Sequence, residues 1–327
     1  MTKKFIILAE SSWDSGGIGG NSGQQYARTL MRLGWNVSYV EPNGTWKLCK
    51  PNKIENPQHT IVMCNFPYTE YNKEIFYELT RTGCHSVCLI VDHWKSINAH
   101  RDYKPELEHE FIKRADRVFA CNPLNVDRLN SVCPEIRLLR NGVDLECFMK
   151  CSSMDTVALQ KGKITLGIVA SFWISSWIDL APVLAYAQNH PKDMVHIIGK
   201  EHSVVNRNTC PANIIFHGVK HWREIPEYIQ QFDVCVVPYN SITTRYTNPI
   251  KVLEYLASGK PVVSCYNKSI SDYPYVYFYR TGKEFEQKIK KAFLQKIDHD
   301  VLFAFLKKNT WEERITTITS CFALSIN

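Results

Sequence analysis

The chain has 327 residues, of which 45% are hydrophobic and 22% charged, with a formal net charge of +7. Such a composition excludes a disordered chain, and the length suits two domains, each with its own core. The apolar run Phe5–Ala9 is too short for a signal peptide, and no run reaches the ~20 residues of a spanning helix, so we expect a cytoplasmic protein. The pI of about 8.7 favours anionic ligands or membrane surfaces, but it is lower than is typical of a nucleic-acid binder.

The twelve cysteines are scattered along the chain, and none of them forms a C-x-x-C pair. Several lie inside apolar runs of the kind that forms strands, where a free thiol behaves as a small hydrophobic side chain. We therefore expect reduced thiols and no metal site.

The first half alternates short apolar runs, rich in β-branched residues, with amphipathic stretches. This rhythm predicts a parallel sheet with helices on both faces. The predicted strands are Phe5–Glu10, Val37–Glu41, Thr60–Phe66, Val87–Asp92, Arg117–Cys121 and Ile136–Leu139, and the predicted helices are Gln24–Leu33, Ile75–Arg81, Leu107–Ala115 and Leu124–Asn130.

A glycine-rich loop separates the first predicted strand from the first helix. Its glycines Gly17, Gly19 and Gly20 let the backbone approach a ligand closely, and the start of the following helix offers N–H groups to an anion. A dinucleotide-binding fingerprint is disfavoured, because Ser22 stands where its third glycine belongs. A flexible surface loop is the alternative interpretation.

The same rhythm restarts after the polar stretch 151–163 and predicts a second doubly wound domain. We place the first domain at residues 1–152 and the second at 153–308. The second set of predicted strands is Ile164–Ala170, Val195–Ile198, Ile214–His217, Val234–Pro238 and Pro261–Ser264, and the helices are Asp179–Asn189, Trp222–Gln231, Pro249–Ser258 and, at the end of the chain, Trp311–Ala323.

The helix predicted at Pro249–Ser258 carries signals at both ends. Asn248 is a suitable N-cap, proline suits the first helical position, and Gly259 suits the position after the last turn. Pro261 then ends the helix, and a buried strand follows at once.

Lys251, in the first turn of this helix, is unusual, because the helix dipole disfavours a cation there by about 0.3–1 kcal/mol. The cation is explained if a phosphate docks at the free N–H groups of the helix start. Glu254 lies one turn further along the same face, where it can accept hydrogen bonds from ribose hydroxyls. The pattern therefore predicts a nucleotide site, and the alternative is a solvated ion pair between Lys251 and Glu254.

Four segments taken together resemble the GT-B glycosyltransferases, and within them the group 1 enzymes of glycosyltransferase family 4. They lie between residues 5 and 265, in the order that the family has. The segments are the glycine loop with the helix that ends in Leu33-Gly34-Trp35, the pair Arg114–Asn122 and Leu139–Phe148, the stretch Phe216–Val219 with Ile225–Tyr239, and the helix motif from Thr247 to Val263.

This resemblance implies an α/β protein of the GT-B fold, with two Rossmann-like, doubly wound parallel-sheet domains that face each other across a cleft. Residues 1–152 would bind the acceptor and residues 153–308 the nucleotide sugar, while the final segment 309–327 would cross back to the first domain. The resemblance also implies no cofactor and no metal, with a nucleoside-diphosphate sugar as the donor substrate.

The resemblance assigns candidate residues to both tasks of glycosyl transfer. Lys251 would neutralise the leaving diphosphate, and Asp92 or His93 would accept the proton of the acceptor hydroxyl. We favour Asp92, which only an inverting enzyme requires; a loop or N-cap acid and a packed imidazole are the alternatives. The expected donor-binding residues are Gly17, Gly19, Gly20, Ser171, Trp173, Gly218, Tyr239, Arg245, Thr247, Asn248, Pro249, Ile250, Lys251 and Glu254.

Two departures from the family pattern leave the donor contacts and the stereochemistry open. The family has a second glutamate eight positions before Glu254, and Tyr246 stands there instead. Many relatives also carry an Arg and a Lys after the first strand of the second domain, whereas the stretch Ser171–Asp179 has neither.

We therefore predict a glycosyltransferase that uses a UDP- or GDP-linked sugar. The expected acceptor is a glycan or a lipid-linked sugar at the inner membrane face, where a net charge of +7 attracts anionic lipid. Two alternatives stay open: an enzyme that glycosylates modified DNA bases, and a non-catalytic protein that binds sugar nucleotides or acts as a scaffold.

Overall fold

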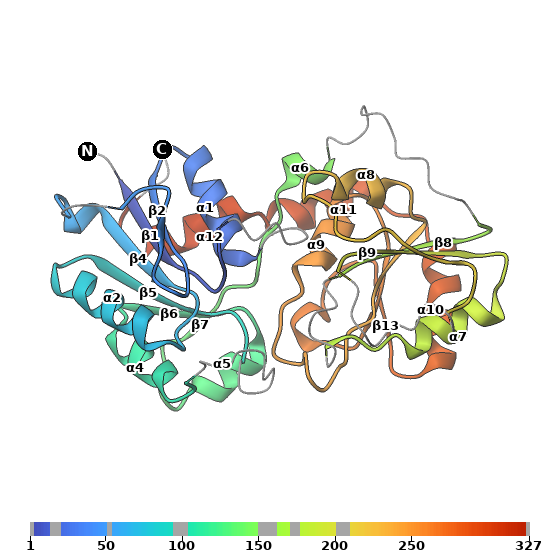
Figure 1. Ribbon diagram of the computed structural model, residues 1–327, viewed down its shortest axis with the longest axis horizontal. Coiled ribbons are helices and arrows are strands. Elements are labelled where there is room, and N and C mark those ends of the chain that lie inside the picture. The colour runs from blue at the N-terminus through green and yellow to red at the C-terminus, as the bar shows by residue number, and fades with distance from the viewer. Residues whose placement is uncertain are drawn as a thin grey trace.

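The computed structural model describes residues 3–13, 21–50, 54–93, 104–149, 162–170, 177–200 and 210–324. Within these ranges the chain forms two α/β domains side by side (Figure 1). The first is built on a seven-stranded sheet in the order β3-β2-β1-β4-β5-β6-β7, and the second on a six-stranded sheet in the order β10-β9-β8-β11-β12-β13.

The first domain contains most elements of the first half of the chain. Its strands are β1 (Lys4–Leu8), β2 (Asn36–Val40), β3 (Trp46–Lys47), β4 (Thr60–Cys64), β5 (His85–Ile90), β6 (Arg117–Ala120) and β7 (Arg137–Leu138). Its helices are α1 (Ser22–Arg32), α2 (Glu70–Arg81), α4 (Leu107–Arg114) and α5 (Pro123–Leu129), with the short η1 (Pro57–His59) before β4.

The second domain follows α6 (Leu145–Met149). Its strands are β8 (Thr165–Val169), β9 (Met194–Ile198), β10 (Ile214–Phe216), β11 (Val234–Val237), β12 (Val262–Cys265) and β13 (Val276–Tyr279). Its helices are α7 (Ala181–Asn189), α8 (Ile225–Gln230), α9 (Ile250–Ala257), η4 (Lys268–Ile270), α10 (Gly282–Leu294) and α11 (His299–Lys307), and α12 (Trp311–Ser320) ends the described chain.

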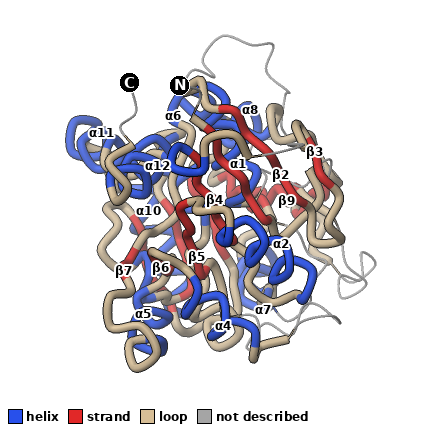
Figure 2. The backbone as a smooth tube through the Cα atoms, turned by 90° about the vertical axis from the view of Figure 1, so that its left-hand side faces the viewer, coloured by secondary structure: helices blue, strands red, loops and turns tan. Residues whose placement is uncertain are grey.

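Strand β1 shows why the sequence forms a two-faced sheet. Phe5 and Ile7 pack in one core with α1 and α12, whereas Ile6 and Leu8 pack in another with α2 and α4. Successive side chains of a strand point to opposite faces, so a run that is apolar at every position requires helices on both sides. Figure 2 shows α2 and α4 in front of the strands in its view of this domain.

The parallel register brings several strand ends to one edge of each sheet. Leu8 at the end of β1 is level with Val40 of β2 and with Cys64 of β4. In the second sheet the strand order changes direction between β8 and β11, and ligands of doubly wound sheets bind at such a switch point, beyond the carboxyl ends of the strands. The predicted pair of parallel sheets is thus confirmed; the two-residue β3, antiparallel to β2, was not predicted.

Helix α12 follows the second domain in sequence but packs against the first (Figure 1). Trp311 is 1% exposed, and its ring lies 5.0 Å from that of Tyr26 on α1. The chain crosses where Val143 N donates to Asn309 O at 2.9 Å. A Cβ atom on Gly142 would come within 2.6 Å of Trp311 N, so only glycine permits this close approach. The exact domain limits at residues 152 and 308 stay predictions.

Candidate active site

The segment between β11 and α9 brings the predicted donor residues to the domain boundary. Asn240 turns this segment, since its side-chain oxygen accepts from Ile242 N at 3.0 Å and from Thr243 N at 3.1 Å. The chain then returns through residues 245–248 to the start of α9. Ile250, the first residue of that helix, packs against the core of the first domain.

The predicted N-cap of α9 is wrong by one residue. Pro249, with an extended backbone, is the N-cap, and the helix begins at Ile250. The Asn248 side chain instead accepts from Asn141 N of the first domain at 2.8 Å and donates to Ser269 Oγ at 3.2 Å. The Asn248 side chain therefore makes a long-range contact and does not cap α9. The predicted end is correct, because Gly259 follows the C-cap with a φ of 72°.

Lys251 and Glu254 form an ion pair, with 2.7 Å between Nζ and Oε2. Their side chains are only 12% and 2% exposed, so this is a buried pair and not the solvated one that we considered. The pair neutralises both groups at the helix start. A phosphate docked at the first N–H groups of α9 would compete with Glu254 for the lysine.

Two carboxyl groups lie at strand ends of the first domain. Asp92 follows β5 and is 9% exposed, and its burial raises its pKa to about 7. Glu10 follows β1; burial and the charge of Asp92 raise its pKa to about 8, although Ser22 Oγ donates to Glu10 Oε1 at 3.2 Å. A carboxyl group with a pKa near neutrality is suited to general acid–base catalysis.

The pKa of Tyr239, just after β11, is raised by groups of both domains. Burial, and then the charge of Asp92 from the first domain, raise its pKa far above the ordinary value. Cys265 and Glu254 contribute to the same upward shift of the Tyr239 pKa. That Asp92, Tyr239 and Glu254 belong to one site stays a prediction.

Tyr246, which replaces the expected acid, lies against His93. The two rings are 4.9 Å apart in an edge-to-face arrangement. The guanidinium of Arg245 lies over the Tyr246 ring at 4.9 Å from its centroid. An aromatic contact across the domain boundary therefore occupies the position where the family has a carboxylate.

A pocket of about 480 Å³ opens at the carboxyl ends of β11, β12 and β13. Leu124 of the first domain lines it together with residues of the second, so it lies on the domain boundary. Two predicted donor residues, Tyr239 and Arg245, line the pocket. Its other lining residues are Asp179, Asn240, Ser241, Ile242, Cys265, Tyr266, Asn267, Lys268, Tyr279 and Arg280.

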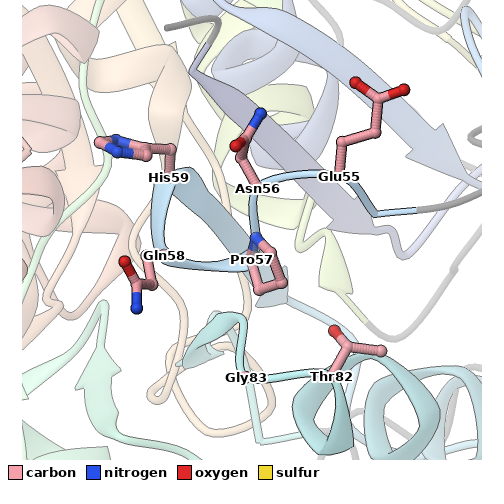
Figure 3. A pocket seen from close by; sticks show the side chains of 7 residues that line it. All are labelled: Glu55, Asn56, Pro57, Gln58, His59, Thr82 and Gly83. Carbon is pink, nitrogen blue, oxygen red and sulfur yellow. The ribbon is translucent and has the colours of Figure 1, made fainter.

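A second pocket, of about 350 Å³, lies away from this site. It is formed by residues 55–59, which lead into β4, and by Thr82 and Gly83, which precede β5 (Figure 3). These residues lie at the amino ends of the strands, whereas Asp92 lies beyond a carboxyl end. The pocket is therefore not part of the candidate site.

Gly218 lies beyond the carboxyl end of β10, where a nucleotide base was predicted. Its φ of 68° is a conformation that favours glycine, and a Cβ atom there would meet none of the described residues within 4 Å. The neighbouring His217 has a pKa lowered to about 4 by burial and by His196, whose Nδ1 lies 2.8 Å from His217 Nε2. At neutral pH His217 is therefore uncharged at this end of β10.

Several predicted residues are not placed by the structure. Gly17, Gly19 and Gly20 of the glycine loop and Ser171 and Trp173 after β8 lie outside the described residues. The part of the chain that is described contains no group of three or more His, Cys, Asp or Glu side chains suited to a metal ion. It also contains no helix that is both long enough and apolar enough to cross a membrane.

Sequence reasoning missed Glu10 and three asparagines, Asn122, Asn125 and Asn141. Glu10 stands at the end of a predicted strand, and the rule that parallel strand ends meet at one edge could have placed it near Asp92. The asparagines carry no such signal, because their partners lie more than 100 residues away in the second domain.

Comparison with known proteins identifies the second domain. Residues 174–298 match the family model described as "Glycosyl transferases group 1". This stretch of the second domain is thus similar to group 1 glycosyltransferases. The chain is 28% identical over 190 residues to TuaH of Bacillus subtilis (strain 168), named as a teichuronic acid biosynthesis glycosyltransferase; the match covers 54% of this chain and 47% of that protein. The chain thus spans about half the length of this relative.

Solved structures confirm the predicted GT-B fold of this chain. A sucrose-phosphate synthase from Thermosynechococcus elongatus superimposes with a TM-score of 0.64 at 14% identity, covering 99% of this chain and 97% of that chain. HepE of Anabaena, in complex with UDP and glucose, superimposes with a TM-score of 0.63 at 12% identity, covering 98% and 99%. The resemblance inferred from the sequence is therefore confirmed for the fold, and residues 174–298 match the expected family model.

Proposed function

We propose that this protein is a glycosyltransferase that moves a sugar from a nucleoside-diphosphate sugar to a hydroxyl of a glycan or lipid-linked acceptor. The observation that carries the proposal is the pocket of about 480 Å³ at the carboxyl ends of β11, β12 and β13, which is lined by Tyr239 and Arg245 and also by Leu124 of the first domain. UDP is the nucleotide that we favour, because the HepE structures contain UDP or UDP-glucose.

The start of α9 is the proposed site of the donor diphosphate. The Thr247 and Asn248 side chains donate within the protein, to Thr244 O and Ser269 Oγ, so we expect the phosphate contacts from the N–H groups of Ile250 and Lys251. Lys251 would turn from Glu254 to the phosphate, and Glu254 would then accept the ribose hydroxyls. We propose Gly218 for the base, and Arg245 for additional positive charge.

Asp92 is the proposed base for the acceptor hydroxyl. Its pKa of about 7 keeps a substantial ionised fraction at neutral pH and still allows it to take up a proton. The leaving diphosphate is neutralised in this proposal by Lys251, Arg245 and helix N–H groups, so that no metal or other cofactor is required.

A peripheral membrane contact is proposed for the end of α10. Phe293 and Leu294 are 41% and 80% exposed there. Lys290, Lys291 and Lys296 surround them in sequence and are also exposed. Apolar side chains among cations suit the surface of an anionic membrane, where a lipid-linked acceptor would lie.

One specific observation favours the non-catalytic alternative. Tyr246 contacts His93 where the family has a carboxylate, so the chain could bind sugar nucleotides without turnover.

The first experiment is a thermal-shift series with UDP, GDP, ADP, CDP and TDP, with and without EDTA. A ligand at 100 times its dissociation constant adds about 2.7 kcal/mol of stability. We expect one diphosphate to raise the melting temperature, equally with and without EDTA. In a separate turnover assay, we expect the protein to release that diphosphate slowly from its sugar conjugate. Binding without release would favour the non-catalytic alternative, and no shift with any nucleotide would contradict both.

A further inference from the structure

Four consecutive backbone carbonyls, from Arg245 to Asn248, accept hydrogen bonds from asparagine side chains of the first domain. The three donors are Asn122, Asn125 and Asn141, which we call the asparagine clamp. Asn122 Nδ2 donates to Arg245 O at 3.0 Å and to Thr247 O at 2.7 Å, Asn125 Nδ2 to Tyr246 O at 3.2 Å, and Asn141 Nδ2 to Asn248 O at 2.7 Å.

The asparagine clamp is buried and fixed in position. Asn122 and Asn125 are 0% exposed, and Asn141 is 2% exposed. Asn122 Oδ1 caps α5 by accepting from Leu124 N at 2.8 Å, and Asn125 Oδ1 accepts from Arg128 Nε at 3.3 Å. These amides therefore cannot turn away from the second domain without losing hydrogen bonds inside the first.

The clamped segment ends directly before α9. Because each of its carbonyls faces the first domain, the direction in which the chain enters the helix depends on that domain. The second domain contributes as well, since Asn267 Nδ2 donates to Thr244 O and to Thr247 O, each at 3.2 Å. The N–H groups at the start of α9 are thus positioned from both sides of the boundary.

We propose that the asparagine clamp consists of positioning residues, through which the first domain sets the affinity of the second domain for the donor nucleotide. A rotation of the domains would break the clamp and release the segment before α9. Because linkage is reciprocal, a nucleotide at α9 would in turn favour the clamped arrangement of the domains. This inference rests on the proposed nucleotide site at the start of α9.

The test measures UDP affinity by isothermal titration calorimetry for Asn122→Ala, Asn125→Ala and Asn141→Ala in the full chain; if another diphosphate gives the thermal shift, that one replaces UDP. We expect a loss of roughly 5- to 150-fold, the usual range of coupling between sites, largest for Asn122 with its two bonds. Asn125→Ala removes a single bond to the clamped segment, so it is the variant to use if the others fail to fold.

Asn213→Ala is the matched control. Asn213 Nδ2 donates to Ala187 O, His190 O and Asp193 O at 3.1, 3.1 and 2.8 Å, all within the second domain. This variant also loses amide-to-carbonyl bonds, but at a place remote from α9. We expect it to lower the melting temperature while UDP affinity stays within about twofold of wild type, as for independent sites.

Asn122→Asp adds a measurement, the pH dependence of UDP affinity, that would not change if Asn122 had only a structural role. The shape is kept, but an ionised carboxylate cannot donate to Arg245 O or Thr247 O. Burial raises the pKa of such a carboxyl, so lowering the pH protonates it and restores one donor. We expect UDP affinity relative to wild type to recover as the pH falls from about 8 to about 5.

The inference is wrong if the clamp variants lose thermal stability yet bind UDP as wild type does, or if Asn213→Ala weakens UDP binding equally. An affinity ratio for Asn122→Asp that does not change with pH would also overturn it. A wild-type protein that binds no nucleoside diphosphate would instead overturn the proposed function, and this inference with it.

Discussion

The two domains present opposite chemistry at their boundary. Asp92 and Glu10 of the first domain are carboxyl groups whose pKa values are raised to about 7 and about 8. Glu254 of the second domain is more deeply buried, at 1% exposure, but has Lys251 at 2.7 Å. The contrast shows two ways to stabilise a buried carboxyl group: it can keep its proton, or it can pair with a cation. The first way suits proton transfer, and the second suits anion binding.

The largest expected effect concerns the proton-accepting side. Asp92→Asn removes the proposed base, so we expect turnover to fall by about 10²- to 10⁴-fold, the usual contribution of general base catalysis. UDP affinity should be unchanged, since Asp92 is neither one of the proposed donor contacts nor part of the asparagine clamp. The measurement is release of nucleoside diphosphate at saturating donor and acceptor.

Glu135→Gln is the control for this prediction, because Glu135 belongs to the same domain but is exposed. If Asp92→Asn keeps full turnover, Asp92 is not the proton acceptor, and the contrast drawn between the two domains does not extend to catalysis. A retaining reaction, in which the leaving phosphate takes the proton, would then replace the inverting one.

The second prediction concerns the ion pair between Glu254 and Lys251. Lys251→Met leaves Glu254 buried and without its cation, which should lower the free energy of unfolding by about 3–5 kcal/mol. Adding Glu254→Gln removes the uncompensated charge and should restore most of that loss. Urea denaturation at pH 7 measures both variants.

The double variant also separates stability from binding. We expect it to fold well but to bind UDP poorly, because both the phosphate cation and the ribose acceptor are missing. A single Lys251→Met variant as stable as wild type would show that Glu254 does not depend on its partner. The contrast between the domains would then be unfounded.

The third prediction uses the opposite pH behaviour of stability and activity. Asp92 and Glu10 have ordinary pKa values of 3.8 and 4.5, so between about pH 4 and pH 8 the folded state binds more protons than the unfolded state. The contribution of these two groups to stability therefore decreases as the pH rises through this window. Turnover should instead rise with pH through about 7, as Asp92 ionises.

The measurement compares wild type with the double variant Asp92→Asn and Glu10→Gln by urea denaturation across this pH range. We expect the variant to gain stability relative to wild type at high pH, by about 1 kcal/mol or more per group. A stability difference that does not change with pH would show that neither pKa is raised.

The elements that the sequence predicted best are those with a local cause. Phe5, Ile6, Ile7 and Leu8 of β1 are all fully buried, and an unbroken apolar run is the direct consequence of burial on both faces. Lys251 and Glu254 were recognised as neighbours because helix geometry places positions three apart on one face. Their burial could not be predicted, because it depends on what packs over the helix.

The errors and omissions come from long-range contacts. Asn248 before a proline is typical of an N-cap, but its partner Asn141 lies 107 positions away. The sequence showed that Tyr246 replaces an acid, yet only the structure shows that it lies against His93 of the other domain. Most strands of both sheets and helix α9 were therefore predictable from the sequence, whereas the contacts across the domain boundary were not.

The smallest expected effect extends the contrast to the outer surface of the second domain. Leu294 is 80% exposed at the end of α10, near Lys290 and Lys291. Replacing both lysines by Gln should weaken binding to anionic vesicles by about 1 kcal/mol per charge, and Leu294→Ser should weaken it further. Sedimentation with phosphatidylserine and phosphatidylcholine vesicles measures this. Lys113→Gln, at an exposed position on α4 of the first domain, should change nothing; if it weakens binding equally, the attraction depends on net charge and not on this surface.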